Sequence, residues 1–176
     1  MNTRKIFLVL FVLTASFSAA SAQGRIDQIV KDWERAKEYT KSYLDAMPDD
    51  KFAFKPKPEM RSFAGQMLHL SDADYAFVSA ATGETNPMKM GELEKSTKET
   101  KADVTAAVLK SYDFVISSIK KMKPEQLSEK VKLFDRFEMT KEDALNKAFE
   151  HQTHHRGQTT AYLRLAGAKP PQEQLF

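Results

Sequence analysis

Four histidines are the residues of this chain whose type and spacing best suit chemistry. They are His69, His151, His154 and His155, and three of them fall within five consecutive positions. On a helix, residues four apart share a face with their Cβ atoms about 5–6 Å apart. His151 and His155 can therefore direct two imidazoles at one divalent cation. His154 points about 100° around the helix from His155, so we expect it to pack or to form a hydrogen bond instead.

A third ligand must come from another part of the chain, and His69 is the remaining histidine. Gly65 and Ala73 lie four residues on either side of it, which leaves room for a neighbouring helix or an ion. Three neutral imidazoles leave an open position on a divalent cation, where a bound water has its pKa lowered towards neutrality. The spacing thus indicates a metal site at His69, His151 and His155. The alternative is a cluster that merely packs.

The identity of the metal stays open at this stage. Zn, Ni, Fe, Mn and Cu all accept three imidazoles, and availability in the cell can decide between them. The chain has no Cys, which excludes disulfides, thiolate metal sites, iron–sulfur clusters and a Cys nucleophile. No Ser-His-Asp arrangement can be argued from spacing, and no Gly-rich phosphate loop is visible.

Each of four further side chains near the histidines could have either of two roles. Asp72 could fix the tautomer of His69 from one helical turn away, or it could be solvated. Gln158 could hydrogen-bond near the site or across helices. Arg156 could bind an anionic substrate or form an interhelical ion pair, and Tyr162 could line a cavity or simply pack.

The first 22 residues have the features of a secretory signal peptide. Arg4 and Lys5 precede an apolar run over residues 6–15, and residues 20–22 form an Ala-Ser-Ala cleavage site. The run is short for a bilayer span of about 20 residues. We therefore expect cleavage after Ala22, a periplasmic or secreted mature chain that begins at Gln23, and no stable membrane insertion.

The mature chain, residues 23–176, has little net charge. Removing Arg4 and Lys5 from the 27 basic side chains leaves 25 against 24 acidic ones, a net charge of +1. No basic run stands out. Because nucleic-acid binding needs a concentrated positive field, we expect no nucleic-acid partner.

Helical periodicity predicts an all-α fold for the mature chain. The four amphipathic segments are residues 25–46, 62–82, 96–122 and 140–166. Ser62, the Ser96-Thr97-Lys98-Glu99 pattern and Thr140 are good helix starts, and Gly83 and Gly167 are good helix ends. Four helices of this length without strong strands predict a four-helix bundle in one domain.

Three connections join these helices. Residues 49–61 carry two Pro and two Phe, so we expect an extended loop whose Phe52 and Phe54 plug one end of the core. Residues 83–95 form a second loop. In residues 124–139, Val131 and Leu133 could form a short strand, but no convincing partner strand is evident.

The histidine segment also resembles a known signature. Residues 151–158, followed by residues 162–167 and Pro170-Pro171, resemble the C-terminal signature of the DinB superfamily of metal-binding four-helix proteins. Residues 61–70 look like the family's segment bearing the first ligand. Residues 111–115 look like its third helix, and residues 54–56 resemble the loop before its second helix. The resemblance covers most of residues 23–176, in the family's order.

The resemblance implies a bundle with up-down-down-up topology and a divalent metal, such as Zn, Ni, Fe or Mn, held by His69, His151 and His155. Family members include thiol-dependent S-transferases and an isomerase that uses a low-molecular-weight thiol, and dimers are common, which suggests a homodimer. Those thiols belong to the cytoplasm, which argues against that reaction in an exported chain. We therefore predict a metal-dependent hydrolase or transferase acting on a small molecule. The alternative is a non-catalytic metal-binding or structural bundle.

Overall fold

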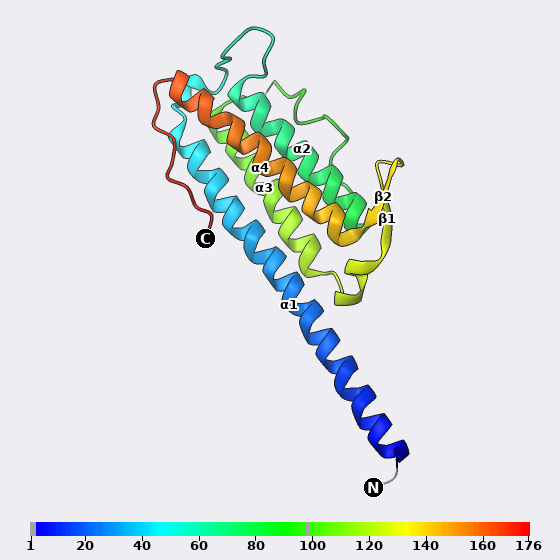
Figure 1. Cartoon of the computed structure of the whole chain (residues 1–176). Coiled ribbons are helices and arrows are strands. Elements are labelled where there is room, and N and C mark those ends of the chain that lie inside the picture. Colours follow the sequence, from blue (N-terminus) through cyan, green and yellow to red (C-terminus); the bar gives the residue numbers. More distant parts are fainter. Residues whose placement is uncertain (1–2, 98) are drawn as a thin grey trace.

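The computed structural model describes residues 3–97 and 99–176, with side chains from residue 23 onward. Helices dominate the fold (Figure 1). The α-helices are α1 (Thr3–Ala46), α2 (Phe63–Thr82), α3 (Lys101–Lys120) and α4 (Lys141–Leu165). Two 3₁₀ helices, η1 (Asp49–Lys51) and η2 (Pro124–Ser128), and two strands, β1 (Lys130–Leu133) and β2 (Phe137–Thr140), complete the described elements.

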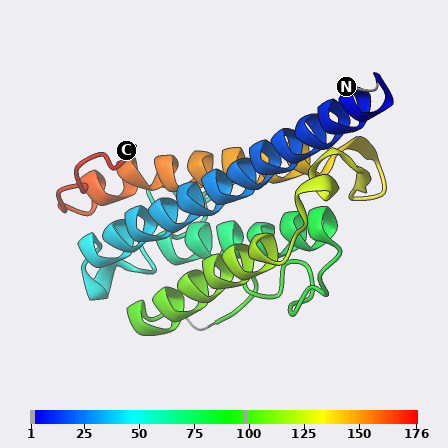
Figure 2. The same ribbon diagram turned by 90° about the horizontal axis from the view of Figure 1, so that it is seen from below.

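The helices follow the predicted up-down-down-up order. In Figure 1, α1 and α4 run one way along the bundle, and α2 and α3 run the other way. Figure 2 shows the four helices side by side from below. Because α2 and α3 are parallel, the chain must return along a helix about 30 Å long before α3 can begin. Residues 83–100 make this return, and we call them the crossover.

The ends of α2 and α4 are those that the sequence predicts. Ser62 Oγ accepts a hydrogen bond from the backbone N–H of Gly65 at 2.9 Å, and Thr140 Oγ1 accepts one from the N–H of Asp143 at 3.0 Å. Gly83 and Gly167 follow the two helices with φ of 83° and 81°. These left-handed conformations favour glycine because it has no Cβ.

The start of α3 differs from the prediction. The helix begins at Lys101, and the side chain of Thr100 accepts a hydrogen bond from the N–H of Asp103. The pattern predicted to start the helix at residues 96–99 includes Lys98, which lies outside the described residues. Glu99 instead accepts a hydrogen bond from Ser62 Oγ at 3.0 Å. Two adjacent cap patterns compete here, and the one directly before the amphipathic run forms the cap.

Residues 124–139 also differ from the prediction, because the short strand has a partner. Strand β1 pairs antiparallel with β2, with Leu133 opposite Phe137. The turn between them has Phe134 and Asp135 at φ of 52° and 55°, and the N–H of Arg136 donates to the carbonyl of Leu133. Turns of this kind usually contain Gly or Asn. Their absence removed the signal from which a hairpin could be predicted.

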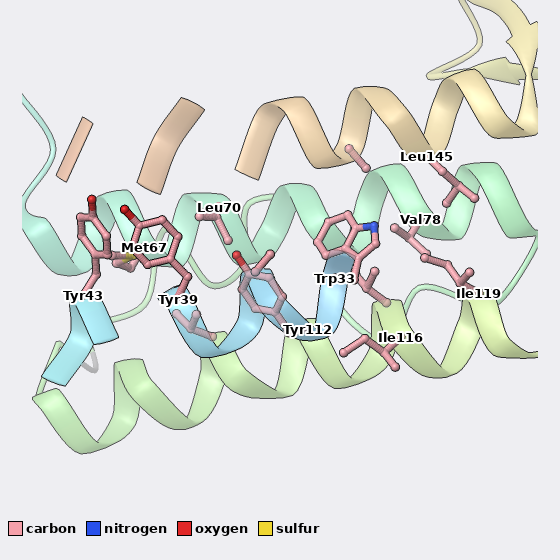
Figure 3. Packing of buried hydrophobic residues seen from close by; sticks show 14 of the residues in the cluster. Trp33, Tyr39, Tyr43, Met67, Leu70, Val78, Tyr112, Ile116, Ile119 and Leu145 are labelled. Carbon is pink, nitrogen blue, oxygen red and sulfur yellow. The ribbon is translucent and has the colours of Figure 1, made fainter. Parts of the chain in front are cut away.

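Large aromatic side chains fill the centre of the bundle (Figure 3). Trp33 is fully buried on α1, and its ring meets Tyr112 of α3 and Phe149 of α4 edge-on, with centroids 5.7 and 5.4 Å apart. At one end of the core, Phe52 is buried against Phe63, as predicted, with centroids 5.2 Å apart. Edge-on aromatic pairs add to the burial of apolar area, so three helices are joined at Trp33.

Helix α1 runs without a break through the predicted cleavage point after Ala22. Its N-terminal part projects beyond the other helices (Figure 1). Residues 1–2 of the predicted signal peptide lie outside the described residues. Among the residues described, no helix combines the length and apolar character that crossing a membrane requires. The signal peptide stays a prediction.

Two glycine substitutions should have opposite effects on stability. Gly83 has φ of 83°, whereas Gly157 lies inside α4, and a Cβ at either position would meet no atom within 4 Å. Gly83→Ala should therefore lower the free energy of unfolding by about 1–2 kcal/mol because of backbone strain alone. Gly157→Ala should raise it by about 0.5–1 kcal/mol. Urea denaturation measures both, and effects of the same sign would contradict the helix end described at Gly83.

Candidate metal centre

Three of the four histidines converge between two helices. One ring nitrogen from each of His69, His151 and His155 lies within 4.8 Å of the others. The ring centroid of His69 lies 5.5 Å from that of His151 and 4.6 Å from that of His155. The ring centroids of His151 and His155 are 4.3 Å apart. Among the described residues, no other group of three His, Asp or Glu side chains meets in this way.

The position of the cluster follows from the packing of α2 against α4. His151 and His155 are one turn apart on α4, so their rings share one face of that helix. His69 lies on α2, which runs antiparallel to α4 along the same side of the bundle (Figure 1). The topology therefore brings together residues that are more than eighty positions apart in the sequence.

Burial keeps the two histidines of α4 uncharged. Burial, together with the charges of neighbouring groups, lowers the pKa of His151 to about 4. Burial, helped by the nearby His151 and His69, lowers the pKa of His155 to about 3. Both imidazoles are thus neutral near pH 7. Neutral imidazole is the form that binds a metal ion.

The donor set fits a divalent cation. Nδ1 of His151 and Nδ1 of His155 are buried and have no hydrogen-bond partner among the described residues. Buried polar atoms normally have partners. An ion about 2.1 Å from each of three nitrogens holds them roughly 3–3.5 Å apart, and the observed limit of 4.8 Å leaves only small ring movements to reach this.

A carboxylate from the crossover completes the surroundings of His69. Glu94 Oε2 lies 2.8 Å from His69 Nδ1, and Glu94 Oε1 accepts a hydrogen bond from Arg61 Nε at 2.6 Å. Burial alone would raise the pKa of Glu94, but the hydrogen bonds and charges of Arg61 and His69 lower it overall. An ionised Glu94 accepts the Nδ1 proton of His69 and leaves Nε2 free for a metal ion.

Asp72 binds the backbone of the crossover and not the ring of His69. Its carboxylate accepts hydrogen bonds from the backbone N–H groups of Leu93 at 3.2 Å and Glu94 at 2.8 Å. Burial raises its pKa, and these two hydrogen bonds oppose that effect. Asp72 therefore fixes the crossover where Glu94 meets His69. The sequence did not point to Glu94, because it lies 25 positions from His69 in a loop.

His154 lies beside the cluster but not in it, as predicted. It is exposed, and its Nε2 is 2.8 Å from Nε2 of Gln158. Gln158 in turn accepts a hydrogen bond from Gln66 of α2. Of the two readings of Gln158, the structure supports the one across helices. This chain of polar contacts tethers α4 to α2 next to the histidine cluster.

Arg156 points into the core, so it is not placed to bind a substrate. It is 4% exposed, donates to Gln152 Oε1 at 2.8 Å, and lies over the ring of Tyr39 at 4.5 Å. Tyr112 of α3 donates to the same Gln152 oxygen at 2.9 Å. A buried charge needs such partners. The contacts fix the rotation of α4, which carries His155 next to Arg156.

Tyr162 also has a structural role. It is buried, and its hydroxyl donates to the backbone carbonyl of Arg61 at 3.1 Å. This bond holds the segment before α2, from which the Arg61 side chain reaches Glu94. Tyr162 thus packs, and its hydrogen bond to the Arg61 backbone helps to hold Arg61 in place against Glu94.

A cavity opens beside the cluster. It has a volume of about 210 Å³, and His69 and His151 form part of its wall. Most of its remaining wall is apolar and comes from α2, the crossover and the hairpin turn. A molecule in this cavity would lie next to two of the three histidines.

The sequence of the chain decides its family. Residues 19–175 match the sequence model of the DinB family. The chain belongs to the DinB family. Among curated proteins, none matches the sequence significantly.

Solved structures of DinB-like proteins share the fold. One from Bacillus cereus ATCC 10987 is 19% identical, with a TM-score of 0.74 over 84% of this chain and 96% of that one. YjoA from Bacillus subtilis is also 19% identical, with a TM-score of 0.65 over 85% and 96% of the two chains. YfiT from Bacillus subtilis is 17% identical, with a TM-score of 0.62 over 81% and 87%. YfiT is described as a probable metal-dependent hydrolase with an unusual four-helix bundle topology.

The histidines should make stability depend on pH once metal is removed. The folded pKa values of His151 and His155, about 4 and about 3, lie below the ordinary value of 6.5, so the unfolded chain binds more protons between pH 6.5 and 4. The stability from the two neutral rings is thus complete above pH 6.5 and decreases as the pH falls. Urea unfolding of chelator-treated protein should show this loss from pH 7 to 5. His155→Gln should reduce the slope of the free energy of unfolding against pH by the equivalent of about one proton taken up on unfolding. An unchanged slope would contradict the burial of His155.

Proposed function

We propose that this DinB-family chain is an exported hydrolase that uses a divalent cation held by His69, His151 and His155 to cleave a small molecule. The observation that carries the proposal is the convergence of three ring nitrogens beside a cavity. A divalent cation bound by three neutral imidazoles supplies a Lewis acid and lowers the pKa of a bound water towards neutrality.

The chain's own residues prepare the site for this chemistry. Glu94 accepts the Nδ1 proton of His69, which fixes the ring's tautomer and direction. Arg61 holds Glu94 from its other oxygen. Burial keeps His151 and His155 neutral, so both can serve as ligands near pH 7.

An enzyme is favoured over a non-catalytic metal site because the cluster can be reached. The segment of residues 124–139 does not close over it: the hairpin turn contributes Phe134 to the wall of the cavity, which still reaches His69 and His151. Hydrolysis needs only water as the second reactant, whereas the thiol-dependent transfer known in the family needs a thiol that is scarce outside the cytoplasm. YfiT, which shares the fold, is described as a probable hydrolase of the same class.

Export is part of the proposal because the bundle begins just after the predicted cleavage point. Among the described residues, Ile26 is the first core side chain of α1, at 2% exposed. Arg25 Nε forms an ion pair with Glu142 of α4 at 2.5 Å. Cleavage after Ala22 would leave both contacts in place. The homodimer and the absence of a nucleic-acid partner stay predictions.

The central test compares metal content and hydrolysis in matched variants. The purified protein should bind about one zinc ion per chain and hydrolyse phenyl acetate in a metal-dependent way. His155→Ala should lose the metal and at least about 100-fold in rate, because the metal contributes several kcal/mol to such reactions. His154→Ala, its exposed neighbour, should keep both. Elemental analysis measures the metal content, and the release of acid measures the rate of hydrolysis. Metal-independent hydrolysis would overturn the proposal, and metal without hydrolysis of any ester would favour the non-catalytic alternative.

Export has its own test. When the full chain is expressed in a host with a secretory pathway, intact mass should show an exported protein that begins at Gln23. Ala22→Phe should block processing, because the cleavage site requires a small residue directly before the cut. Ser21→Phe, one position earlier, should still be processed. A cytoplasmic protein that retains residues 1–22 would contradict the prediction.

A further inference from the structure

The cavity beside the histidines has walls of distinct chemistry. The wall contains Ala73, Ala76 and Phe77 of α2, Met90 of the crossover, and Phe134 of the hairpin turn. The rings of Phe77 and Phe134 meet edge-on with centroids 4.8 Å apart. Phe77 also lies against His151, with centroids 5.4 Å apart. An apolar wall therefore continues directly into the metal centre.

The charged groups of the cavity are acidic, and both are already engaged. Asp72 accepts hydrogen bonds from two backbone N–H groups, and Glu94 is paired with Arg61 and His69. Among the described residues, no Lys or Arg lines the cavity. A bound cation would attract an anion at the metal itself, but a negative group against the rest of the wall would meet two carboxylates and no positive side chain, so electrostatics favour an uncharged group there.

The volume limits the size of the group that the cavity can enclose. A dry apolar cavity of roughly 150 Å³ holds benzene, and pockets for drug-sized ligands have roughly 300–1,000 Å³. At about 210 Å³, this cavity suits one ring or a branched chain together with a few further atoms.

Phe134 stands out because of its backbone. Its φ is 52°, a conformation that Asn or Gly adopts more readily than a bulky side chain. Strained residues of this kind cluster where the side chain has a function. Phe134 is 40% exposed as a residue, so its ring contacts Phe77 on one side and leaves room for contact with a bound molecule.

We propose that the site takes a small uncharged ester or amide with a single aromatic or branched aliphatic group, and that Phe134 and Phe77 select this group. The inference rests on the proposed hydrolase and specifies its substrate class. The apolar group lies against the two rings, which directs the acyl carbon towards His69 and His151. Hydrolysis breaks the acyl C–O or C–N bond; the acyl carbon takes the hydroxyl of water, and the leaving atom takes the remaining proton.

Binding of acetanilide, a neutral and slowly hydrolysed amide with one ring, tests the proposal. Calorimetry on the purified full chain should show saturable binding in both the metal-free and the zinc-loaded forms. In the metal-free form, where no zinc ion can attract its carboxylate, the anionic analogue 4-acetamidobenzoate should bind at least about tenfold more weakly, because its charge meets Asp72 and Glu94. Equal or tighter binding of the anion in that form would overturn the inference.

A pair of matched variants assigns the binding to the cavity. Phe134→Asn removes the ring, and Asn adopts the positive φ with less strain, so the variant should fold at least as well as the unsubstituted chain. Its affinity for acetanilide should nevertheless be about fivefold lower or more, because the apolar contact is lost. Phe137→Thr removes a half-exposed ring from the same hairpin outside the cavity, and should leave binding unchanged. Unaltered affinity in Phe134→Asn, or no saturable binding in either form, would overturn the inference.

The two proposals can fail separately. If acetanilide binds with this dependence on Phe134 but no ester is hydrolysed, the proposed binding of an apolar group in the cavity is supported and the proposed hydrolase activity is wrong. If zinc-dependent hydrolysis is equally fast for methyl acetate and benzyl acetate, whose leaving groups are of similar basicity, and is unchanged in Phe134→Asn, the hydrolase stands and the selection of an apolar group fails.

Discussion

The antiparallel packing of α2 against α4 is the contact on which the rest of the site depends. His69 alone, or His151 and His155 alone, would present too few nitrogens to hold an ion firmly. Only where the two helices meet do three imidazoles come within 4.8 Å. Core burial stabilises this contact, and the same burial keeps two of the rings neutral. Packing therefore supplies both the geometry and the protonation state.

Polar contacts set the rotation of the helices, which apolar packing leaves loosely defined. Arg156, next to His155, is held by Gln152 and by the ring of Tyr39. Gln158, one turn beyond His154, is tied to α2 through Gln66. A small rotation of α4 would leave these groups unpaired and would also turn His155 away from His69. Such networks favour one arrangement strongly when every member is satisfied.

The local signals in the sequence were sufficient for the helices but not for the connections. Periodicity and the caps at Ser62 and Thr140 predicted α2 and α4, and the spacing of His151 and His155 predicted the cluster. Glu94 could not be predicted, because its contact with His69 depends on the path of the crossover and on Asp72. The hairpin was missed because Phe134 occupies a turn position where Gly or Asn is usual. Helices and the residues they carry can be read from the sequence, whereas contacts that depend on the path of a connection cannot.

The parallel course of α2 and α3 has a consequence for how such a protein can diverge. It obliges a long return segment to pass the three histidines, and that segment carries Met90 and Glu94. The hairpin tip, another connection, also contributes to the cavity wall. The helices that bear the histidines and the loops that line the cavity are thus physically separate parts. Loop replacement should therefore reshape the cavity while the histidine cluster stays intact, which makes this architecture a natural starting point for engineering new specificities.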